Sequence, residues 1–165
     1  MGVSKPTEMT IRDLLQEELR RRGVTIVPEF SVSTPTGLLK PDILLKNGAA
    51  YVVETKLGAE TKLLEAMVKL YDYQKYVTEA KGAFAVLFPQ ELRQPWSHEV
   101  ILNIAKNPKT EYVVTAIFKD LRPSQRFAGN LSEIADWMAG HVLRAPVVEA
   151  DTGFAIRVLR DAVSY

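Results

Sequence analysis

Residues 38–57 read LLKPDILLKNGAAYVVETKL, and their pattern sets the expected topology of the chain. Asn47-Gly48 joins two largely apolar runs, which is a strong signal for a β-hairpin. The sequence therefore predicts two antiparallel strands, at residues 38–46 and 49–57. Residues 24–32 are rich in β-branched side chains and predict a further strand before them. Together the three strands form an antiparallel meander.

Helical patterns precede and follow this meander. Thr7 or Thr10 can cap a first helix that Gly23 ends, and a second helix is predicted over residues 60–80, ended by Gly82. A buried strand, a short helix, a fifth strand and two C-terminal helices are then predicted at residues 83–88, 97–106, 111–119, 130–143 and 151–163. This order of elements predicts an α/β fold in which helices pack against a sheet.

Composition and charge exclude several classes of protein. The chain has 165 residues, of which 21 are Lys or Arg and 20 are Asp or Glu, so its net charge is +1. Binding to nucleic acid by bulk charge alone is therefore excluded, although a local basic face is not. The chain has no cysteine, and His98 and His141 lie far apart. Disulfide frameworks, cysteine nucleophiles and zinc clusters are therefore not expected.

Length and hydropathy set the expected organisation. No apolar run approaches the roughly 20 residues that a membrane span needs, and the N-terminus carries no recognisable signal segment. We therefore expect a cytoplasmic protein with no membrane partner. One domain is expected over residues 1–150, followed by a C-terminal helix at 151–165 that is a candidate linker to a further domain.

Charged residues interrupt two of the predicted strands at matching places. Pro41 removes a backbone donor, and Asp42 is an unfavourable residue among apolar neighbours in a strand. Glu54 and Lys56 place two charges in the next strand, and their spacing puts them on one strand face. The antiparallel partner strand can bring Asp42 beside them. The plain interpretation is a cross-strand ion pair on a solvated surface.

The joint pattern of two carboxylates and one lysine favours a second interpretation, metal-assisted hydrolysis of a phosphodiester. Mg²⁺ is held by carboxylate oxygens, keeps several waters and also binds phosphate. The ion lowers the pKa of a bound water, and a nearby lysine can orient that water and stabilise the transition state. Asp42, Glu54 and Lys56 are the residues that this interpretation needs.

Pro41-Asp42, eleven intervening residues and then Glu54-Thr55-Lys56 resemble the signature of the PD-(D/E)XK nuclease superfamily. The shared core of that family is a helix, a three-strand meander, a helix and a strand, which matches the order expected over residues 7–88. The phrase at 51–56, with Gly58 just after it, resembles the nuclease domains of restriction enzymes fused to motors and methyltransferases. The resemblance implies a restriction-endonuclease-like core with an added strand and C-terminal helices.

The resemblance also implies a role for each residue of the motif. Asp42 and Glu54 would bind Mg²⁺, for which Mn²⁺ is a possible substitute, helped by the backbone carbonyl of Thr55. Lys56 would position the attacking water. Some family members add a glutamate from the first helix, and Glu18 is the residue whose direction around the helix fits. An ion pair of Glu18 with a neighbouring arginine is the alternative.

Many relatives carry a glutamine and then a tyrosine on the second helix. Here Gln74 lies at the centre of the apolar stripe of that helix, where a buried amide must be hydrogen-bonded, so it is predicted to act at the active site or on DNA. In the related restriction domains the glutamine lies nearer the helix start, where this chain has Lys69, whereas Tyr73 fits their tyrosine. Lys69, Tyr73 and Lys40 are the candidate DNA-binding residues.

The predicted function is that of a Mg²⁺-dependent DNA endonuclease, the nuclease module of a restriction-modification enzyme. A helicase, translocase or methyltransferase module, fused or associated, would feed it DNA, since the balanced charge suits weak binding of its own. One alternative is a non-catalytic nucleic-acid-binding domain that kept the nuclease fold. Another is a nuclease of the same fold directed at junctions or RNA. The presence of Asp42, Glu54 and Lys56 together favours an enzyme.

The metal site makes one demand on the Asn47-Gly48 hairpin. A two-residue turn would pair Lys46 with Ala49 and put Asp42 and Glu54 on opposite faces of the sheet. A three-residue loop with Gly48 in a left-handed bulge would instead pair Leu45 with Ala49 and put both carboxylates on one face. A bulge at Pro41 would have the same effect. The sequence therefore predicts that this hairpin is not closed by a two-residue turn.

Overall fold

The structure is a computed structural model that describes residues 7–27, 30–35, 37–47, 49–57, 61–77, 80–119 and 122–150. The side chains of 49, 61–63, 65, 66, 74 and 144–150 lie outside this description. The α-helices are α1 Thr7–Arg21, α2 Thr61–Tyr76, α3 His98–Lys106 and α4 Leu131–Ala150, and a short 3₁₀ helix, η1, covers Gln90–Arg93. The strands are β1 Thr25–Val27, β2 Val32–Thr34, β3 Gly37–Leu39, β4 Ile43–Asn47, β5 Ala49–Leu57, β6 Ala80–Phe88, β7 Tyr112–Phe118 and β8 Gln125–Gly129.

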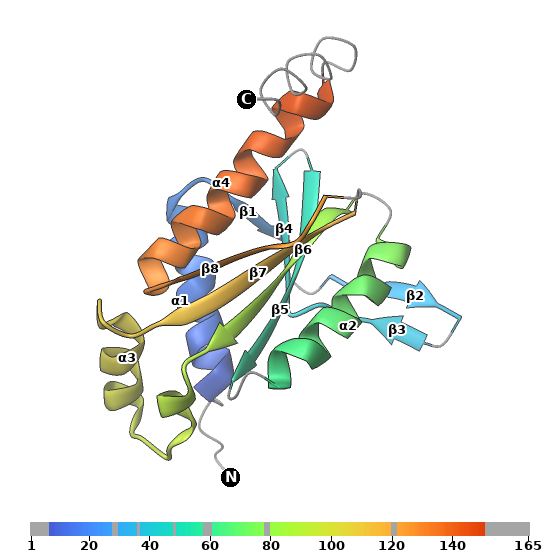
Figure 1. Ribbon diagram of the computed structural model, residues 1–165. Helices are drawn as coiled ribbons and strands as arrows, with labels where there is room; N and C mark the ends of the chain where they lie inside the picture. Colours follow the sequence, from blue (N-terminus) through green and yellow to red (C-terminus); the bar gives the residue numbers. More distant parts are fainter. Residues whose placement is uncertain are drawn as a thin grey trace.

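A six-stranded sheet in the order β1-β4-β5-β6-β7-β8 forms the centre, and β2 and β3 pair in a separate small sheet (Figure 1). The pair β5–β6 is parallel, and the other neighbouring pairs of the large sheet are antiparallel. The chain returns from β5 to β6 through α2, as a parallel pair requires. The expected α/β fold is thus confirmed in its coarse form, a mixed fold with a mostly antiparallel sheet.

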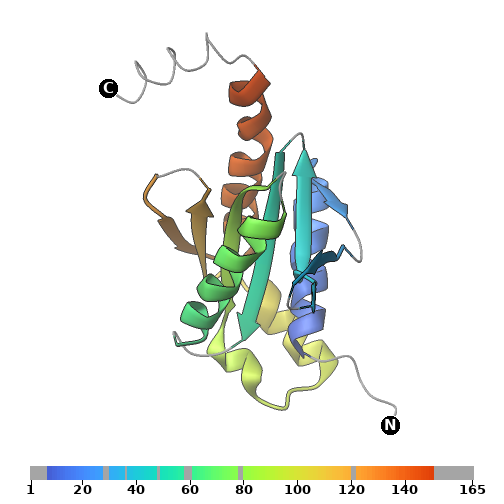
Figure 2. The same cartoon turned by 90° about the vertical axis from the view of Figure 1, so that its right-hand side faces the viewer.

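Each face of the large sheet has its own hydrophobic core. Tyr51 and Val53 of β5 lie in the core that α1, α3 and α4 cover, whereas Val52 lies in the core beneath α2. This alternation is the period-two pattern of a strand buried on both sides. Figure 2 shows α2 on one side of the sheet and α1 and α4 on the other. Residues at the end of β5 therefore have helices on both sides.

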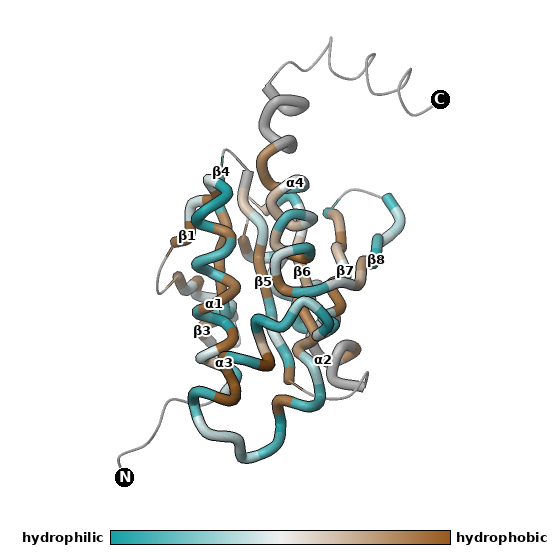
Figure 3. Tube along the Cα trace, turned by 90° about the vertical axis from the view of Figure 1, so that its left-hand side faces the viewer, coloured by the Kyte–Doolittle hydropathy of each residue, from teal (hydrophilic) through white to brown (hydrophobic). Residues whose placement is uncertain are grey.

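Helix α1 forms where the apolar stripe predicts it. Ile11, Leu15 and Leu19 are fully buried, and hydrophobic and hydrophilic residues alternate along α1 in Figure 3. Gly23 has a φ of 89°, and its N–H donates to the carbonyl of Arg20, which ends the helix with a left-handed residue. The predicted stop of the first helix is confirmed, whereas Thr7 and Thr10, the predicted caps, both lie within α1.

The meander is present, but two of its predicted strands are each divided. β1 and β4 pair in the large sheet, whereas Val32, Leu38 and Leu39, at the other ends of the two predicted strands, belong to β2 and β3, which pair with one another outside it. The second strand breaks at residues 40–42, where Pro41 has no N–H to donate to a ladder. The outcome is a short hairpin that leads directly into Asp42.

The second helix ends earlier than the sequence predicted. α2 stops at Tyr76, and residues 80–82 belong to β6, so Gly82 is not a helix stop. Gly82 instead serves close packing, because a Cβ there would lie 2.7 Å from Cε2 of Tyr51 and 2.8 Å from the carbonyl oxygen of Ile117. Its lack of a side chain lets the Tyr51 ring lie against the strand.

The C-terminal half confirms the predicted helix starts at 97 and 130 and adds elements. Ser97 accepts from the Val100 N–H at the start of α3, and Asn130 and Glu133 form a reciprocal capping box at the start of α4. α4 continues to Ala150, past its predicted end at Leu143, and β8 and η1 were not predicted. The predicted helix at 151–163 lies outside the described residues. Across the described part of the chain, no helix is long and apolar enough to cross a membrane.

The hairpin between β4 and β5 has the register that the site demands. Asn47 pairs with Ala49 and Ile43 with Val53, so paired positions add to an even number and the hairpin has no two-residue turn. That prediction is confirmed, but the partner of Leu45 is Tyr51 and not Ala49. The predicted conformation of Gly48 lies outside the described residues. Continued by one residue, this register puts Asp42 opposite Glu54.

Candidate active site

Asp42 lies where the pairing of β4 with β5 stops. Its Oδ2 accepts hydrogen bonds from the Thr55 N–H at 2.7 Å and from the Thr55 hydroxyl at 3.0 Å. Its Oδ1 forms an ion pair with Nη2 of Arg12, from α1, at 3.3 Å. The Asp42 side chain is 20% exposed, so solvent still reaches the carboxylate. Asp42 therefore connects the edge of β5 to the helix on one face of the sheet.

Thr55 places a backbone oxygen at the same edge. The N–H and C=O of one strand residue point to the same side of the strand. Since the Thr55 N–H points to Asp42, the Thr55 carbonyl points to the edge where β4 no longer pairs. This is the carbonyl that the family resemblance implies as a metal ligand.

Glu54 is the most deeply buried acid among the described residues, with 3% of its surface exposed. One oxygen, Oε2, accepts from Nζ of Lys69 on α2 at 3.2 Å, whereas the other, Oε1, is buried without a hydrogen-bond partner. Burial raises the pKa of Glu54, and the charge of Asp42 raises it further, while Lys69 and Lys56 oppose the shift. A buried carboxylate oxygen without a partner is costly, and such a group calls for an explanation.

Lys56 belongs to the same cluster of charges. It follows Glu54 by two residues on β5, so both side chains lie on one face, as the sequence predicted, and this is the face that α2 covers. The positive charge of Lys56 lowers the pKa values of Glu54 and of Glu8 against the effects of burial. The side chain is half-buried.

Glu8 is a member of this cluster that the sequence analysis missed. It lies in the first turn of α1, four residues before Arg12, so the two side chains share a helix face. Burial is the main cause of its raised pKa, and the charge of Asp42 raises the pKa further. The cations that oppose this shift are those of the cluster itself: Arg12, Lys56 and Lys69.

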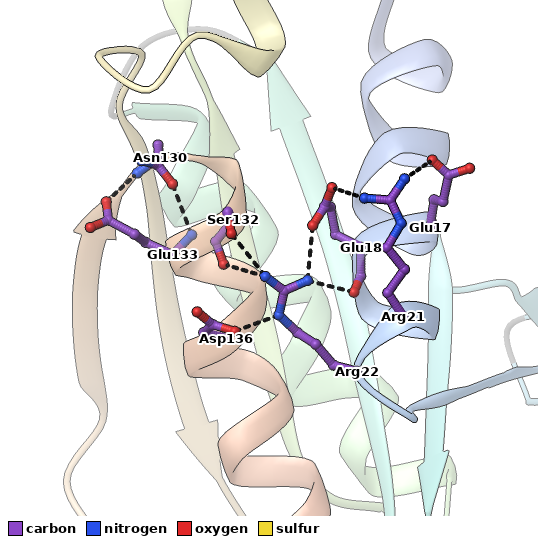
Figure 4. A network of polar contacts seen from close by, with 8 residues as sticks. All are labelled: Glu17, Glu18, Arg21, Arg22, Asn130, Ser132, Glu133 and Asp136. Atoms are coloured by element: carbon purple, nitrogen blue, oxygen red, sulfur yellow. Dashed lines mark hydrogen bonds and ion pairs between the residues drawn. The ribbon is translucent and has the colours of Figure 1, made fainter.

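Glu18, the predicted ligand from the first helix, lies elsewhere. Its carboxylate pairs with Arg21 and Arg22 at 2.9 Å each. Figure 4 shows that Arg22 also reaches Ser132 and Asp136 of α4, so Glu18 belongs to a network that joins α1 to α4. Ten residues of helix separate it from Glu8, about 15 Å along the axis. The alternative interpretation, an ion pair with a neighbouring arginine, is the correct one for Glu18.

The second helix contributes Lys69 and Tyr73 to the site. Lys69 pairs with Glu54, and the Tyr73 hydroxyl donates to the carbonyl of Lys40 at 3.0 Å. Tyr73 thus fixes the segment just before Pro41 and Asp42, while the Lys40 side chain is exposed. The side chain of Gln74 lies outside the described residues, so its predicted role stays a prediction.

The donor set suits a hard divalent cation that keeps most of its water. Among the described residues, no group of three or more His, Cys, Asp or Glu side chains is arranged to hold a metal ion. The carboxylates of Asp42 and Glu54 are turned toward Arg12 and Lys69 instead. Mg²⁺, however, is usually held by one or two carboxylates and retains several waters. The unpartnered Oε1 of Glu54 supplies such an oxygen.

Comparisons with known proteins found no match to this chain, whether among family models, curated proteins or solved structures.

Proposed function

We propose that the chain is a Mg²⁺-dependent DNA endonuclease with a restriction-endonuclease-like core, the nuclease module of a restriction-modification enzyme. The observation that carries this proposal is the buried Glu54 carboxylate, whose Oε1 has no partner while Asp42 lies near enough to raise its pKa. A structural ion pair needs no unpaired buried oxygen, because leaving one unpaired costs stability. A cation that binds at this oxygen removes that cost.

The residues have separable roles in this proposal. Asp42, Glu54 and the Thr55 carbonyl would hold Mg²⁺, or Mn²⁺ in its place, and Glu8, rather than the predicted Glu18, would act from the first helix as a group near the ion. The ion, when bound, supplies an acidified water and neutralises charge on the scissile phosphate. Lys56 orients the attacking water and stabilises the charge that develops on the phosphate oxygens.

The surrounding residues keep this arrangement in place. The two hydrogen bonds from Thr55 fix the direction of the Asp42 carboxylate. The hydroxyl of Tyr73 donates to the carbonyl of Lys40 and so anchors the chain two residues before Asp42. Lys69, which pairs with Glu54, and Lys40, two residues before Asp42 in the sequence, are exposed cations and are suited to DNA phosphates. Lys40 and Lys69 would therefore position a substrate without taking part in bond cleavage.

The substrate class is tested directly with the wild-type chain. Supercoiled plasmid, linear duplex, a four-way junction and RNA are each incubated with Mg²⁺ or with EDTA. The proposal predicts nicking of the plasmid in Mg²⁺ and none in EDTA. Cutting of the junction or of RNA alone would favour the alternative nucleases of the same fold, and binding without cutting would favour a non-catalytic domain.

A further inference from the structure

Each carboxylate of the proposed metal site already has a cation from a helix beside it. Nη2 of Arg12 lies 3.3 Å from Oδ1 of Asp42, and Nζ of Lys69 lies 3.2 Å from Oε2 of Glu54. Neither cation belongs to the motif on β4 and β5. A divalent ion that binds these carboxylates is therefore repelled by the positive charges of these two side chains.

The charges of the whole cluster balance. Glu8, Asp42 and Glu54 are acidic, and the basic groups that act on them are Arg12, Lys56 and Lys69. Three acids and three bases give a formal charge of zero, so the cluster attracts a free divalent ion weakly. With the ion bound its charge becomes +2, which attracts a phosphodiester. Metal and phosphate therefore each favour the binding of the other.

Arg12 is the cation best placed to respond to both the metal ion and the phosphate. Its side chain is 21% exposed, so it is held close to the protein, whereas Lys69 is 55% exposed. Its Nε also donates to the Thr55 hydroxyl at 3.4 Å, so the guanidinium contacts both the Asp42 carboxylate and the hydroxyl that donates to it. A guanidinium matches phosphate as well as carboxylate, because its planar fork can donate two parallel hydrogen bonds to either.

We propose that Arg12 takes the place of the divalent ion beside Asp42 in the DNA-free protein and moves to a DNA phosphate when metal and DNA bind together. This inference rests on the proposed function and adds its regulation. No covalent step is involved. Because binding free energies are linked, DNA must raise the affinity for Mg²⁺ by the same factor by which Mg²⁺ raises the affinity for DNA. The site thereby stays inactive toward free metal until DNA is present.

The test is calorimetric titration of Mg²⁺ into the DNA-free chain. Arg12→Gln removes the charge, keeps a hydrogen-bonding side chain near Thr55 and should bind Mg²⁺ on the order of tenfold more tightly than wild type. Arg12→Lys keeps the charge and should stay close to wild type. Arg20→Gln is the matched control, because Arg20 lies on the same helix, is exposed and contacts Gln16. A short phosphorothioate duplex, which retains the backbone charge, should raise the Mg²⁺ affinity of wild type about tenfold and that of Arg12→Gln by less.

The outcomes separate this inference from the proposed function. If Asp42→Asn abolishes Mg²⁺ binding but Arg12→Gln binds no more tightly than wild type, the inference fails and the metal site stands. If Mg²⁺ binding is unchanged by Asp42→Asn, both fail. Should Arg12→Gln prove too unstable to titrate, the wild type alone decides, because a duplex that leaves its Mg²⁺ affinity unchanged overturns the coupling.

Discussion

Oδ2 of Asp42 accepts two hydrogen bonds from Thr55, one from the backbone N–H and one from the hydroxyl. In the continued register of β4 and β5, the residue opposite Thr55 is Pro41. The Asp42 side chain therefore takes the place of a ladder carbonyl just beyond the point where pairing stops. This residue has a structural role in the sheet besides its proposed role as a metal ligand.

Removing the Asp42 carboxylate should therefore destabilise the fold. Asp42→Ala leaves the Thr55 N–H and the Arg12 guanidinium without their acceptor, and we expect a loss of about 1–3 kcal/mol. Asp42→Asn retains an acceptor oxygen for Thr55 and should lose less. Urea unfolding without metal measures both, and an Asp42→Ala variant as stable as wild type would contradict this role.

Glu54 should make the metal-free protein less stable as pH rises. Burial raises its folded-state pKa above the ordinary value of 4.5, so the folded state holds the proton more tightly than the unfolded state. The favourable contribution is complete below pH 4.5 and is lost as pH rises through the folded-state pKa. Glu54→Gln mimics the protonated form. The melting temperature of this variant should therefore exceed that of wild type by more at pH 7 than at pH 4.

The control for this experiment is Glu17→Gln, because Glu17 is an exposed glutamate on α1 with 58% of its side chain exposed. Its melting temperature should differ from wild type by a similar amount at both pH values. If the melting temperature of Glu54→Gln relative to wild type does not rise between pH 4 and pH 7, the charged form of Glu54 is not held in an unfavourable environment.

The two glutamates of α1 provide a matched pair. Glu8→Gln should weaken Mg²⁺ binding about tenfold, the order of effect of a group near a metal rather than on it. Glu18→Gln should leave Mg²⁺ binding unchanged and lower the melting temperature, because Glu18 pairs with Arg21 and Arg22. Equal Mg²⁺ affinities for the two variants would place the metal away from the start of α1.

Gly82 should tolerate no side chain. An added Cβ would meet Cε2 of Tyr51 and the carbonyl oxygen of Ile117 below 3 Å, so Gly82→Ala should cost about 1–3 kcal/mol. Ser33→Ala on the exposed face of β2 is the control and should change little. Thermal unfolding compares them, and an unaffected Gly82→Ala would mean that β6 and Tyr51 do not pack as described.

Local signals in the sequence predicted the elements that depend on local chemistry. Gly23, Ser97 and Asn130 mark real helix ends, because each satisfies backbone groups within a few residues of itself. The parity of the hairpin followed from requiring Asp42 and Glu54 on one face. β8 was missed because its residues, QRFAG, are mostly exposed and show no clean apolar alternation.

The predictions that the structure contradicts concern packing between segments far apart in the sequence. A glycine after a helical pattern is typical of a helix stop, but Gly82 is needed because the ring of Tyr51 packs against it. The prediction for Glu18 used its direction around the first helix but not its position along the helix axis. Since α1 turns back at Gly23 into β1, and β1 is antiparallel to β4, α1 and β4 begin at the same end. That topology brings Glu8 next to Asp42. No local pattern pointed to Arg12 as the partner of Asp42.

Cleavage of DNA through Glu54, Asp42 and Lys56 would be measured by the rate of plasmid nicking in Mg²⁺. Wild type and Lys75→Ala, an exposed lysine on α2, should nick supercoiled plasmid. Glu54→Gln, Asp42→Asn and Lys56→Ala should each nick at least about 10²-fold more slowly while remaining folded. Nicking by these three variants at the wild-type rate, or no nicking by wild type even with its partner module, would rule out this activity at this site.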